Sequence, residues 1–195
     1  MHTALLALYS LTIVSLVWAR FRFFEFRSED HQDKRVAWIY DPLAGLHIVV
    51  SYYFFLTVTS MPILKAVFSI LALMTGELLF VCSVRTAKHL NFAQSSNSSS
   101  LVENGPFSVV RHSLYLSYSL IWLSSTLLFN SALLWITLGS LIAFYIFSAK
   151  REEQAILSSR YSREYMNYKN RVGMFLPRIS QWISWILELS TKPKS

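Results

Sequence analysis

Residues 114–148 read LYLSYSLIWLSSTLLFNSALLWITLGSLIAFYIFS, two apolar segments with one polar joint between them. The segments Leu114–Phe129 and Ser131–Ser148 have nearly the length, about 20 residues, that a helix needs to cross the hydrocarbon core of a membrane. Only Asn130 separates them, so two helices here have to run antiparallel and side by side. The stretch therefore predicts a tight helical hairpin whose outer ends lie at the same membrane surface.

The whole chain has the composition of an integral membrane protein. Hydrophobic residues make up 53% of its 195 residues, charged residues only 15%, and the mean hydropathy is +0.38. Three more apolar segments precede the hairpin: Thr3–Ala19, Leu43–Ser60 and Ile63–Val84. We expect an all-α integral membrane protein with five transmembrane helices, followed by a cytoplasmic helical segment.

The connections carry local signals of their own. Asp41-Pro42 predicts the start of the second spanning helix, because proline favours the first helical position. Met61-Pro62 predicts a tight hairpin between the second and third spans. The polar run QSSNSSS (residues 94–100) is typical of a loop. The last apolar piece, residues 179–189, is too short to span and predicts a helix lying in the membrane interface.

The distribution of cations predicts the orientation. Seventeen of the eighteen Lys and Arg residues follow the first, third and fifth spans, and the remaining one, Lys65, lies near the turn after the second span. Cytoplasmic loops carry the excess of such residues. We therefore expect the N-terminus outside and the C-terminus in the cytoplasm, in a bacterial inner membrane or the endoplasmic reticulum. The net charge of +7 then reflects topology and anionic headgroups, and it does not point to nucleic acid.

Several common site types have no support in the sequence. It contains no GxGxxG or GxxxxGK[ST] loop and no HExxH pair, which argues against a Rossmann unit, a P-loop and a zincin site. The single cysteine, Cys82, lies in an apolar run and is expected to be a small buried side chain. We expect no metal.

Polar side chains cluster at the two outer ends of the hairpin. Arg111, His112 and Tyr115 stand where the fourth span begins, and Glu152 and Glu153 follow the end of the fifth together with Lys150 and Arg151. Because the two spans are antiparallel neighbours, these groups have to meet at the cytoplasmic surface. Each could be an ordinary interfacial or solvated residue, but together they form a candidate site.

The order of these residues resembles the C-terminal signature of the isoprenylcysteine carboxyl methyltransferase family and its phospholipid methyltransferase-like bacterial relatives. The resemblance covers residues 101–177. The matching positions are Leu101, Val102, Gly105, Pro106, Phe107, Arg111, His112, Tyr115, Glu152, Glu153, Tyr161, Tyr165, Tyr168, Arg171, Val172 and Pro177. Ser113, Ser162 and Gly173 depart from it, since the family has Pro, Gly and Pro there. Ser113 could instead cap the first turn of its helix with its hydroxyl.

The resemblance implies a site for S-adenosyl-L-methionine (the methyl donor) built without a Rossmann fold. It implies that Leu101, Val102 and Phe107 line the adenine and ribose side and that Glu153 binds a polar group. Residues from the helix entrance, namely His112, Ser113, Leu114 and Tyr115, would hold the cofactor. No catalytic residue follows from the resemblance, and Arg111, Arg151 and Glu152 are the candidates. Residues 1–195 are then one membrane domain, with a three-span part (1–93), the cofactor-binding region (94–178), and an interfacial helix and tail (179–195).

The methyl acceptor implied first is a lipophilic or prenylated substrate such as an isoprenylcysteine carboxylate. Eukaryotic family members place an arginine on the last helix to orient that carboxylate, and the position aligned with it here is Ala149. The alternative acceptor is the amine of a phospholipid or another small lipophilic amine or thiol. An amine would need a base, for which Glu152 or His112 are candidates. Membrane lipids are the expected surroundings, and the oligomeric state stays open.

Two other functional classes remain alternatives. An NADPH-dependent reductase of the sterol reductase type has a similar stretch with Arg and His, although the order of Glu, Tyr and Arg fits methyltransferases better. A non-catalytic membrane scaffold could also keep this fold. Binding of S-adenosylmethionine would separate both from a methyltransferase.

Overall fold

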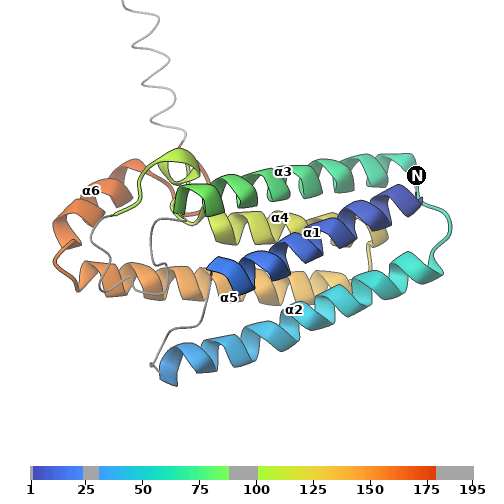
Figure 1. The fold of residues 1–195 in the computed structure, drawn as a ribbon, viewed down its shortest axis with the longest axis horizontal. Helices are drawn as coiled ribbons and strands as arrows, with labels where there is room; N and C mark the ends of the chain where they lie inside the picture. The colour runs from blue at the N-terminus through green and yellow to red at the C-terminus, as the bar shows by residue number, and fades with distance from the viewer. Residues whose placement is uncertain (1, 24–30, 88–100, 179–195) are drawn as a thin grey trace, which may run out of the picture.

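The computed structural model describes residues 2–23, 31–87 and 101–178, and within these ranges the chain is helical. The elements are α1 (His2–Phe23), α2 (His31–Thr57), α3 (Ile63–Ala87), the short 3₁₀ helix η1 (Gly105–Ser108), α4 (Ser113–Phe129), α5 (Ala132–Leu157) and α6 (Ser162–Arg171). Figure 1 shows α1 to α5 running roughly lengthwise, with α6 at one end. The all-helical prediction is confirmed for these residues, whose one β-type pairing is an isolated parallel bridge between Val110 and Gly173.

Four helices are long and apolar enough to cross a membrane: His2–Arg20, Ile39–Thr57, Ile63–Ala87 and Ala132–Leu157. Their lipid-facing positions carry large apolar side chains, such as Leu11, Val49, Leu78 and Ile136, each more than 60% exposed. α4 is apolar too but has only 17 residues. The chain is therefore an integral membrane protein of helical type.

Pro42 lies inside α2, so the prediction that Asp41-Pro42 begins this helix was wrong. Proline removes one backbone donor, but helices of membrane proteins tolerate this because neighbouring groups can satisfy the released carbonyl. The adjacent Asp41 accepts two hydrogen bonds from the guanidinium of Arg20 in α1, at 2.6 and 2.7 Å. This position therefore joins two helices instead of starting one.

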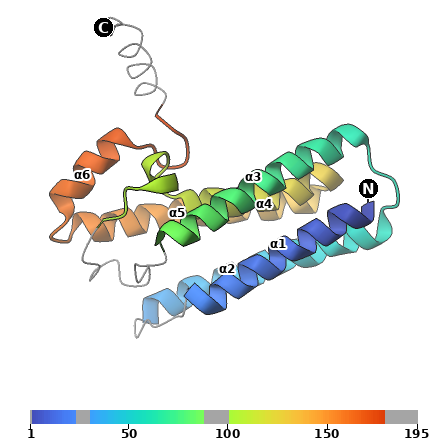
Figure 2. The same cartoon turned by 45° about the horizontal axis from the view of Figure 1, so that its top comes forward.

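The connection predicted at Met61-Pro62 is short, since only residues 58–62 separate α2 from α3. The two helices do not stay together as a tight hairpin, however. Figure 2 shows them diverging from this connection, because α2 packs mainly against α5 and α3 packs along α4.

Small residues let α3 and α4 pack closely. A Cβ added at Gly76 of α3 would lie 2.9 Å from a side-chain carbon of Ile121 and 3.0 Å from the carbonyl oxygen of Ser117. Nearer the site, the hydroxyls of Ser83 and Ser113 lie 2.9 Å apart and both side chains are fully buried. Ser113 therefore does not cap α4, of which it is the first residue, because its hydroxyl accepts a hydrogen bond from Ser83 of α3. The N-cap residue, His112, makes no side-chain capping bond either.

A buried histidine fixes α2 against α4 and α5. His47 is fully buried, its Nδ1 lies 2.8 Å from Thr137 Oγ1, and its Nε2 lies 3.1 Å from Ser125 Oγ and 3.2 Å from the carbonyl oxygen of Trp122. Because every polar atom of the ring has a partner, this group stabilises one register of the three helices.

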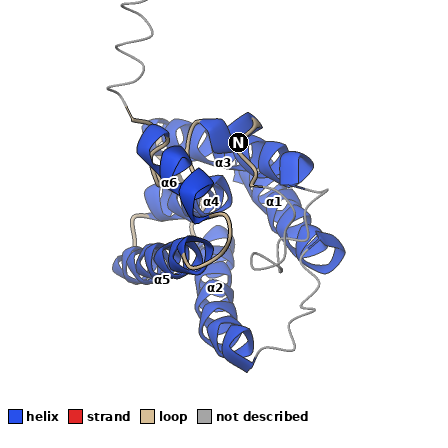
Figure 3. Ribbon diagram, turned by 90° about the vertical axis from the view of Figure 1, so that its left-hand side faces the viewer, coloured by secondary structure: helices blue, strands red, loops and turns tan. Residues whose placement is uncertain are grey.

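The turn between α4 and α5 brings the site residues to one end of the bundle. α4 ends at Phe129, Asn130 adopts a left-handed conformation (φ 51°, ψ 38°), and α5 begins at Ala132. Asparagine is one of the residues that tolerate this conformation. α5 continues past the predicted end of its span, Ser148, to Leu157. α6 then folds back over the end of the bundle, which faces the viewer in Figure 3.

Two predicted features lie outside the described residues. These are the loop at residues 94–100 and the interfacial helix at residues 179–189. The division of the chain into parts ending at residues 93 and 178 stays a prediction.

Candidate functional site

The segment that leads into α4 is held in place by a glycine and a buried tyrosine. Gly105 begins η1 with φ +57°, and a Cβ on this residue would lie 2.7 Å from Thr86 Oγ1 of α3, so both its conformation and its surroundings require glycine. Phe107 is buried, and its carbonyl oxygen accepts a hydrogen bond of 2.6 Å from the hydroxyl of Tyr168 in α6. Burial raises the pKa of Tyr168 above its ordinary value, which keeps this hydroxyl protonated as the donor.

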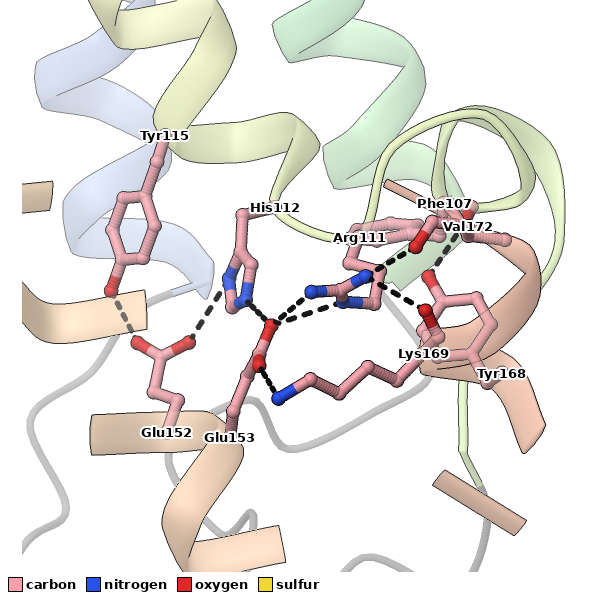
Figure 4. Close-up of polar contacts among 9 residues, drawn as sticks. All are labelled: Phe107, Arg111, His112, Tyr115, Glu152, Glu153, Tyr168, Lys169 and Val172. Atoms are coloured by element: carbon pink, nitrogen blue, oxygen red, sulfur yellow. Dashed lines mark hydrogen bonds and ion pairs between the residues drawn. The ribbon is translucent and has the colours of Figure 1, made fainter. Parts of the chain in front are cut away.

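A buried ion pair joins the start of α4 to α5. Arg111 Nη2 lies 2.7 Å and Nε 3.0 Å from Glu153 Oε1, and the two side chains are only 6% and 5% exposed. The other oxygen, Glu153 Oε2, lies 2.9 Å from Lys169 Nζ of α6. Figure 4 shows both contacts. One carboxylate thus connects three parts of the chain.

Arg111 also fastens the segment that follows α6. Its Nη1 donates to the carbonyl oxygens of Val172 and, at 3.3 Å, Lys169. Its backbone N–H donates to Gly173 O at 2.8 Å, and that of His112 donates to Met174 O at 3.1 Å. We call residues 169–174 the clamped segment.

Gly173 is the departure from the family pattern that this geometry explains. A Cβ at this position would lie 1.8 Å from the carbonyl oxygen of Leu176, far inside any allowed contact. Because the chain turns back on itself so closely there, glycine is needed for the clamped segment to reach Arg111 and His112.

The second carboxylate belongs to a more open group of side chains. The hydroxyl of Tyr115 donates to Glu152 Oε1, and Glu152 Oε2 lies 3.6 Å from His112 Nδ1. His112 Nε2 lies 3.3 Å from Glu153 Oε1, so the imidazole stands between the two carboxylates (Figure 4). The side chain of Glu152 is 45% exposed, in contrast to 5% for Glu153. Glu152 is therefore the carboxylate that can meet another molecule.

Aromatic rings line the same place. The ring of His112 stacks on that of Tyr115 with centroids 5.8 Å apart, and Tyr115 stacks on Tyr145 of α5 at 5.3 Å. Phe175, just after the clamped segment, lies 5.9 Å from His112. Aromatic faces of this kind attract cations.

The structure brings most of the predicted site residues together. Arg111, His112, Tyr115, Glu152 and Glu153 converge across α4 and α5, as the order of the sequence predicted. The structure thereby confirms that the outer ends of the two apolar segments are neighbours.

Five other predicted residues lie around this group or face away from it. Leu101 packs against Tyr165, Tyr168 and Val172 of the α6 region, and Val102 is half-buried. Ser113 faces Ser83, and Leu114 packs with Ala19, Phe80 and Val84. The side chains of these last two serve the packing of α4, and only their backbone is available at the helix start. Arg151 is half-buried, next to Glu152 on α5.

Sequence reasoning missed Lys169 and the backbone of the clamped segment. Lys169 is one of several cations after the fifth span, and nothing in its position distinguished it. The spacing of Tyr165, Tyr168 and Val172, all buried on one side of the α6 region, is the signal that could have indicated its packing onto the site.

Comparison with known proteins gives one match. Residues 64–164, more than half of the chain, match the family described as phospholipid methyltransferase. These residues include α3 except its first residue, then η1, α4, α5 and the start of α6. The comparisons with curated proteins and with solved structures found no match. On the family match, the chain belongs to the phospholipid methyltransferase family, part of the isoprenylcysteine carboxyl methyltransferase-like group of membrane methyltransferases.

Proposed function

We propose that this protein transfers a methyl group from S-adenosylmethionine to an amine on a membrane lipid headgroup. The family supports a membrane methyltransferase of phospholipid type, and its members generally use this methyl donor. The observation that carries the choice of an amine is Glu152, a half-exposed carboxylate held by Tyr115 and His112 where α4 begins. An amine needs such a group, whereas an ionised carboxylate acceptor does not.

The residues at the start of α4 fit the methyl donor. The N-cap residue His112 makes no side-chain capping bond, so the first backbone N–H groups of α4, at Ser113, Leu114 and Tyr115, can bind the carboxylate of the donor's methionine part. The rings of His112, Tyr115 and Phe175 provide faces for a sulfonium cation. When bound, the donor supplies an activated methyl group. We place its adenine and ribose on the side of Leu101, Val102 and Phe107.

The roles of the two carboxylates differ in this proposal. Arg111, His112 and Lys169 supply four donor atoms to Glu153, about as many as a carboxylate can accept. We therefore assign Glu153 a positioning role: it holds Arg111, and through Arg111 the clamped segment, so that the site keeps its shape. Direct binding of the cofactor by Glu153, as the family resemblance implies, is the less favoured assignment.

Glu152 is the proposed proton acceptor. An alkylammonium headgroup has to lose a proton before its nitrogen can attack the methyl carbon. Glu152 can take that proton, while Tyr115 donates to Oε1 and His112 lies beside Oε2. A donor bound at the start of α4 would supply the methyl group and leave as a neutral thioether, and the deprotonated headgroup nitrogen would take the methyl group together with the positive charge.

An isoprenylcysteine-like carboxylate is the second candidate acceptor. The position of the family's carboxylate-orienting arginine is Ala149, which is fully buried, so a cation would have to come from its neighbour Lys150 or from Arg151. This makes the carboxylate the weaker candidate. The match to a methyltransferase family also favours methyl transfer over an NADPH-dependent reductase or an inactive scaffold.

The proposed topology has five spans, with the N-terminus outside and the site at the cytoplasmic surface. With 17 residues, α4 is about 26 Å long, slightly less than a hydrocarbon core of about 30 Å. Arg85 and Arg111 lie at the same end of the bundle as Glu152, which is the arrangement expected of the cytoplasmic side. A bacterial inner membrane and the endoplasmic reticulum both fit.

The test is methyl transfer by the purified protein in lipid bilayers. Isotopically labelled S-adenosylmethionine is offered with phosphatidylethanolamine or with a farnesylated cysteine analogue, across a range of pH. We expect label in the phospholipid and a rate that rises with pH near neutrality, because the amine has to be deprotonated. Label only in the cysteine analogue, with a flat pH profile, would favour the carboxylate acceptor and contradict the proposal.

A further inference from the structure

An ion pair between the first two spans lies beside the proposed site. Arg20 of α1 donates two parallel hydrogen bonds to Asp41 of α2, from Nη1 to Oδ1 at 2.6 Å and from Nη2 to Oδ2 at 2.7 Å. Arg20 is the last residue of the apolar stretch His2–Arg20, and Asp41 is close to the start of the next, Ile39–Thr57. The pair therefore lies where these spans leave the membrane, at the boundary with water.

Both side chains of this pair can be reached from outside the protein. The side chain of Arg20 is 35% exposed and that of Asp41 is 43% exposed, close to the 45% of Glu152. An ion pair with this exposure contributes little to stability, because water screens both charges. The guanidinium can therefore exchange Asp41 for another anion at low cost.

The residue before Arg20 places the pair level with the start of α4. Ala19 is buried in one cluster with Phe80 of α3 and Leu114, the second residue of α4. Figure 1 shows the end of α1 and the start of α2 on the side of the bundle where α6 lies. Arg20 is thus at the same membrane surface as the site.

The residue before Asp41 measures how far the pair is from Glu152. The ring of Tyr40 lies 5.9 Å from that of Tyr145. Tyr145 lies 5.3 Å from Tyr115, whose hydroxyl donates to Glu152. Tyr145 is buried, so these rings serve only as a measure and form no path for a ligand. A ligand that joins the exposed groups, Asp41 and Glu152, lies over the ends of the rings at the membrane surface.

The two cations that precede Glu152 in the sequence stand on other sides of α5. A helix turns by about 100° per residue, so Glu152, seven positions after Tyr145, lies on the same side as that ring. Lys150 and Arg151, five and six positions after Tyr145, lie on sides that face away from it. Arg20 is the cation that the rings connect to Glu152.

The chemistry of an aminophospholipid fits the two ends of this arrangement. Its amine and its phosphate are separated by two carbon atoms, and with a hydrogen bond at each end such a headgroup spans roughly 10 Å. This length is comparable to the two ring-to-ring steps from Tyr115 to Tyr40. A guanidinium binds a phosphate as it binds a carboxylate, through two parallel N–H donors. The phosphate also carries one negative charge, as Asp41 does, so the exchange preserves the charge balance around Arg20.

We propose that Arg20 binds the phosphate of the lipid whose amine lies at Glu152, and that Asp41 holds the guanidinium in position until the phosphate replaces it. The inference rests on the proposed function, since it concerns the same acceptor lipid. Both residues lie outside the range matched to the family, 64–164. Recognition of the phosphate is therefore a contribution of the first two spans.

The experiment compares an acceptor that has a phosphate with one that lacks it. Methyl transfer by the full chain is measured in maltoside micelles, which contain no phosphate, with phosphatidylethanolamine or a long-chain alkylamine as acceptor. Arg20→Gln should raise KM for phosphatidylethanolamine by roughly 10-fold or more, the range of a charged hydrogen bond, with kcat nearly unchanged. Arg20→Lys should raise it less. Asp41→Asn removes the competing anion and should lower this KM or leave it unchanged.

Two controls accompany these variants. KM for the alkylamine should be the same in the parent and in all variants, because this acceptor has no phosphate. Arg85→Gln removes an exposed cation of α3 at the same end of the bundle and should leave both KM values unchanged. Retention of phosphatidylethanolamine by each variant is measured in parallel by native mass spectrometry.

The outcomes separate this inference from the proposed function. An ion pair that only joined two helices would give the same change in Arg20→Gln and Asp41→Asn with both acceptors, and this result would overturn the role of Arg20. An unchanged KM in Arg20→Gln would overturn it too. Transfer by the parent to neither acceptor would overturn the proposed function. Phosphatidylethanolamine retention that is lost in Arg20→Gln and kept in Asp41→Asn would still support the phosphate contact.

Discussion

Replacement of Glu153 by Gln is the sharpest test of the site, because one carboxylate holds Arg111, Lys169 and His112. Glutamine has nearly the same shape and can still accept a hydrogen bond, but it removes the negative charge. Arg111, 6% exposed, then remains as a buried cation without its counter-ion. We expect Glu153→Gln to weaken S-adenosylmethionine binding severely while the protein still inserts into the membrane.

The magnitude follows from the burial of the pair. Removal of one partner from a buried ion pair costs about 3–5 kcal/mol, because the other charge stays desolvated. If the proposed site keeps its shape only while Arg111 holds the clamped segment, a cost of about 3 kcal/mol corresponds to roughly 100-fold weaker cofactor binding.

Calorimetric titration of S-adenosylmethionine into the protein in lipid nanodiscs measures this effect. Glu152→Gln is the matched control, since it makes the same change one residue earlier on a side chain that is 45% exposed, and we expect its affinity to change by less than about threefold. Thermal unfolding of both variants shows whether the helices remain assembled. Equal affinity of Glu153→Gln and the parent would refute the reasoning.

Three further predictions concern other parts of the molecule. Glu152→Gln should lower kcat for an amine acceptor, measured by label transfer, by about 100-fold and leave cofactor affinity nearly unchanged. An unchanged kcat would exclude Glu152 as the base. Gly173→Ala should destabilise the protein by at least about 2 kcal/mol in thermal unfolding and weaken cofactor binding, because the added Cβ would overlap the carbonyl oxygen of Leu176. Gly139→Ala is the control and should be tolerated, because there is open space around Gly139. Similar stability of the two variants would contradict the role of Gly173. His47→Leu should cost about 2 kcal/mol by removing the ring's buried hydrogen bonds to Thr137, Ser125 and the carbonyl oxygen of Trp122. Leu46→Ala, at a 46% exposed position, should have little effect, and equal losses in the two variants would argue against the buried network.

The sequence predicted the parts of the site that depend on helix length and connection. Two apolar segments joined at Asn130 leave few arrangements, so the proximity of His112 and Tyr115 to the Glu152-Glu153 pair could be inferred without coordinates. The all-helical character could be predicted from the composition, because a chain in lipid has to satisfy its backbone hydrogen bonds internally.

The remaining features depend on long-range packing, which one sequence does not reveal. The start of α2 was misplaced because proline is a boundary signal in soluble helices, while here Asp41 beside it is held by Arg20 from another helix. The hydroxyl of Ser113, predicted to cap its helix, instead faces α3, where it accepts a hydrogen bond from Ser83. The roles of Lys169 and Gly173 depend on the packing of α6 and the clamped segment against the start of α4. The contacts that hold this packing join Arg111 to residues about sixty positions later in the chain.

The attachment of the clamped segment to Arg111 has a consequence for biogenesis. Arg111 emerges from the ribosome and enters its place at the membrane surface well before Val172 and Gly173 are made, because synthesis runs from the N-terminus. The helical bundle can therefore assemble first, but the site can close only after the final part of the described chain has been added. A nascent chain that stops before Lys169 would hold its helices in the membrane without closing the proposed site, which becomes complete only after residues 169–174 have been made.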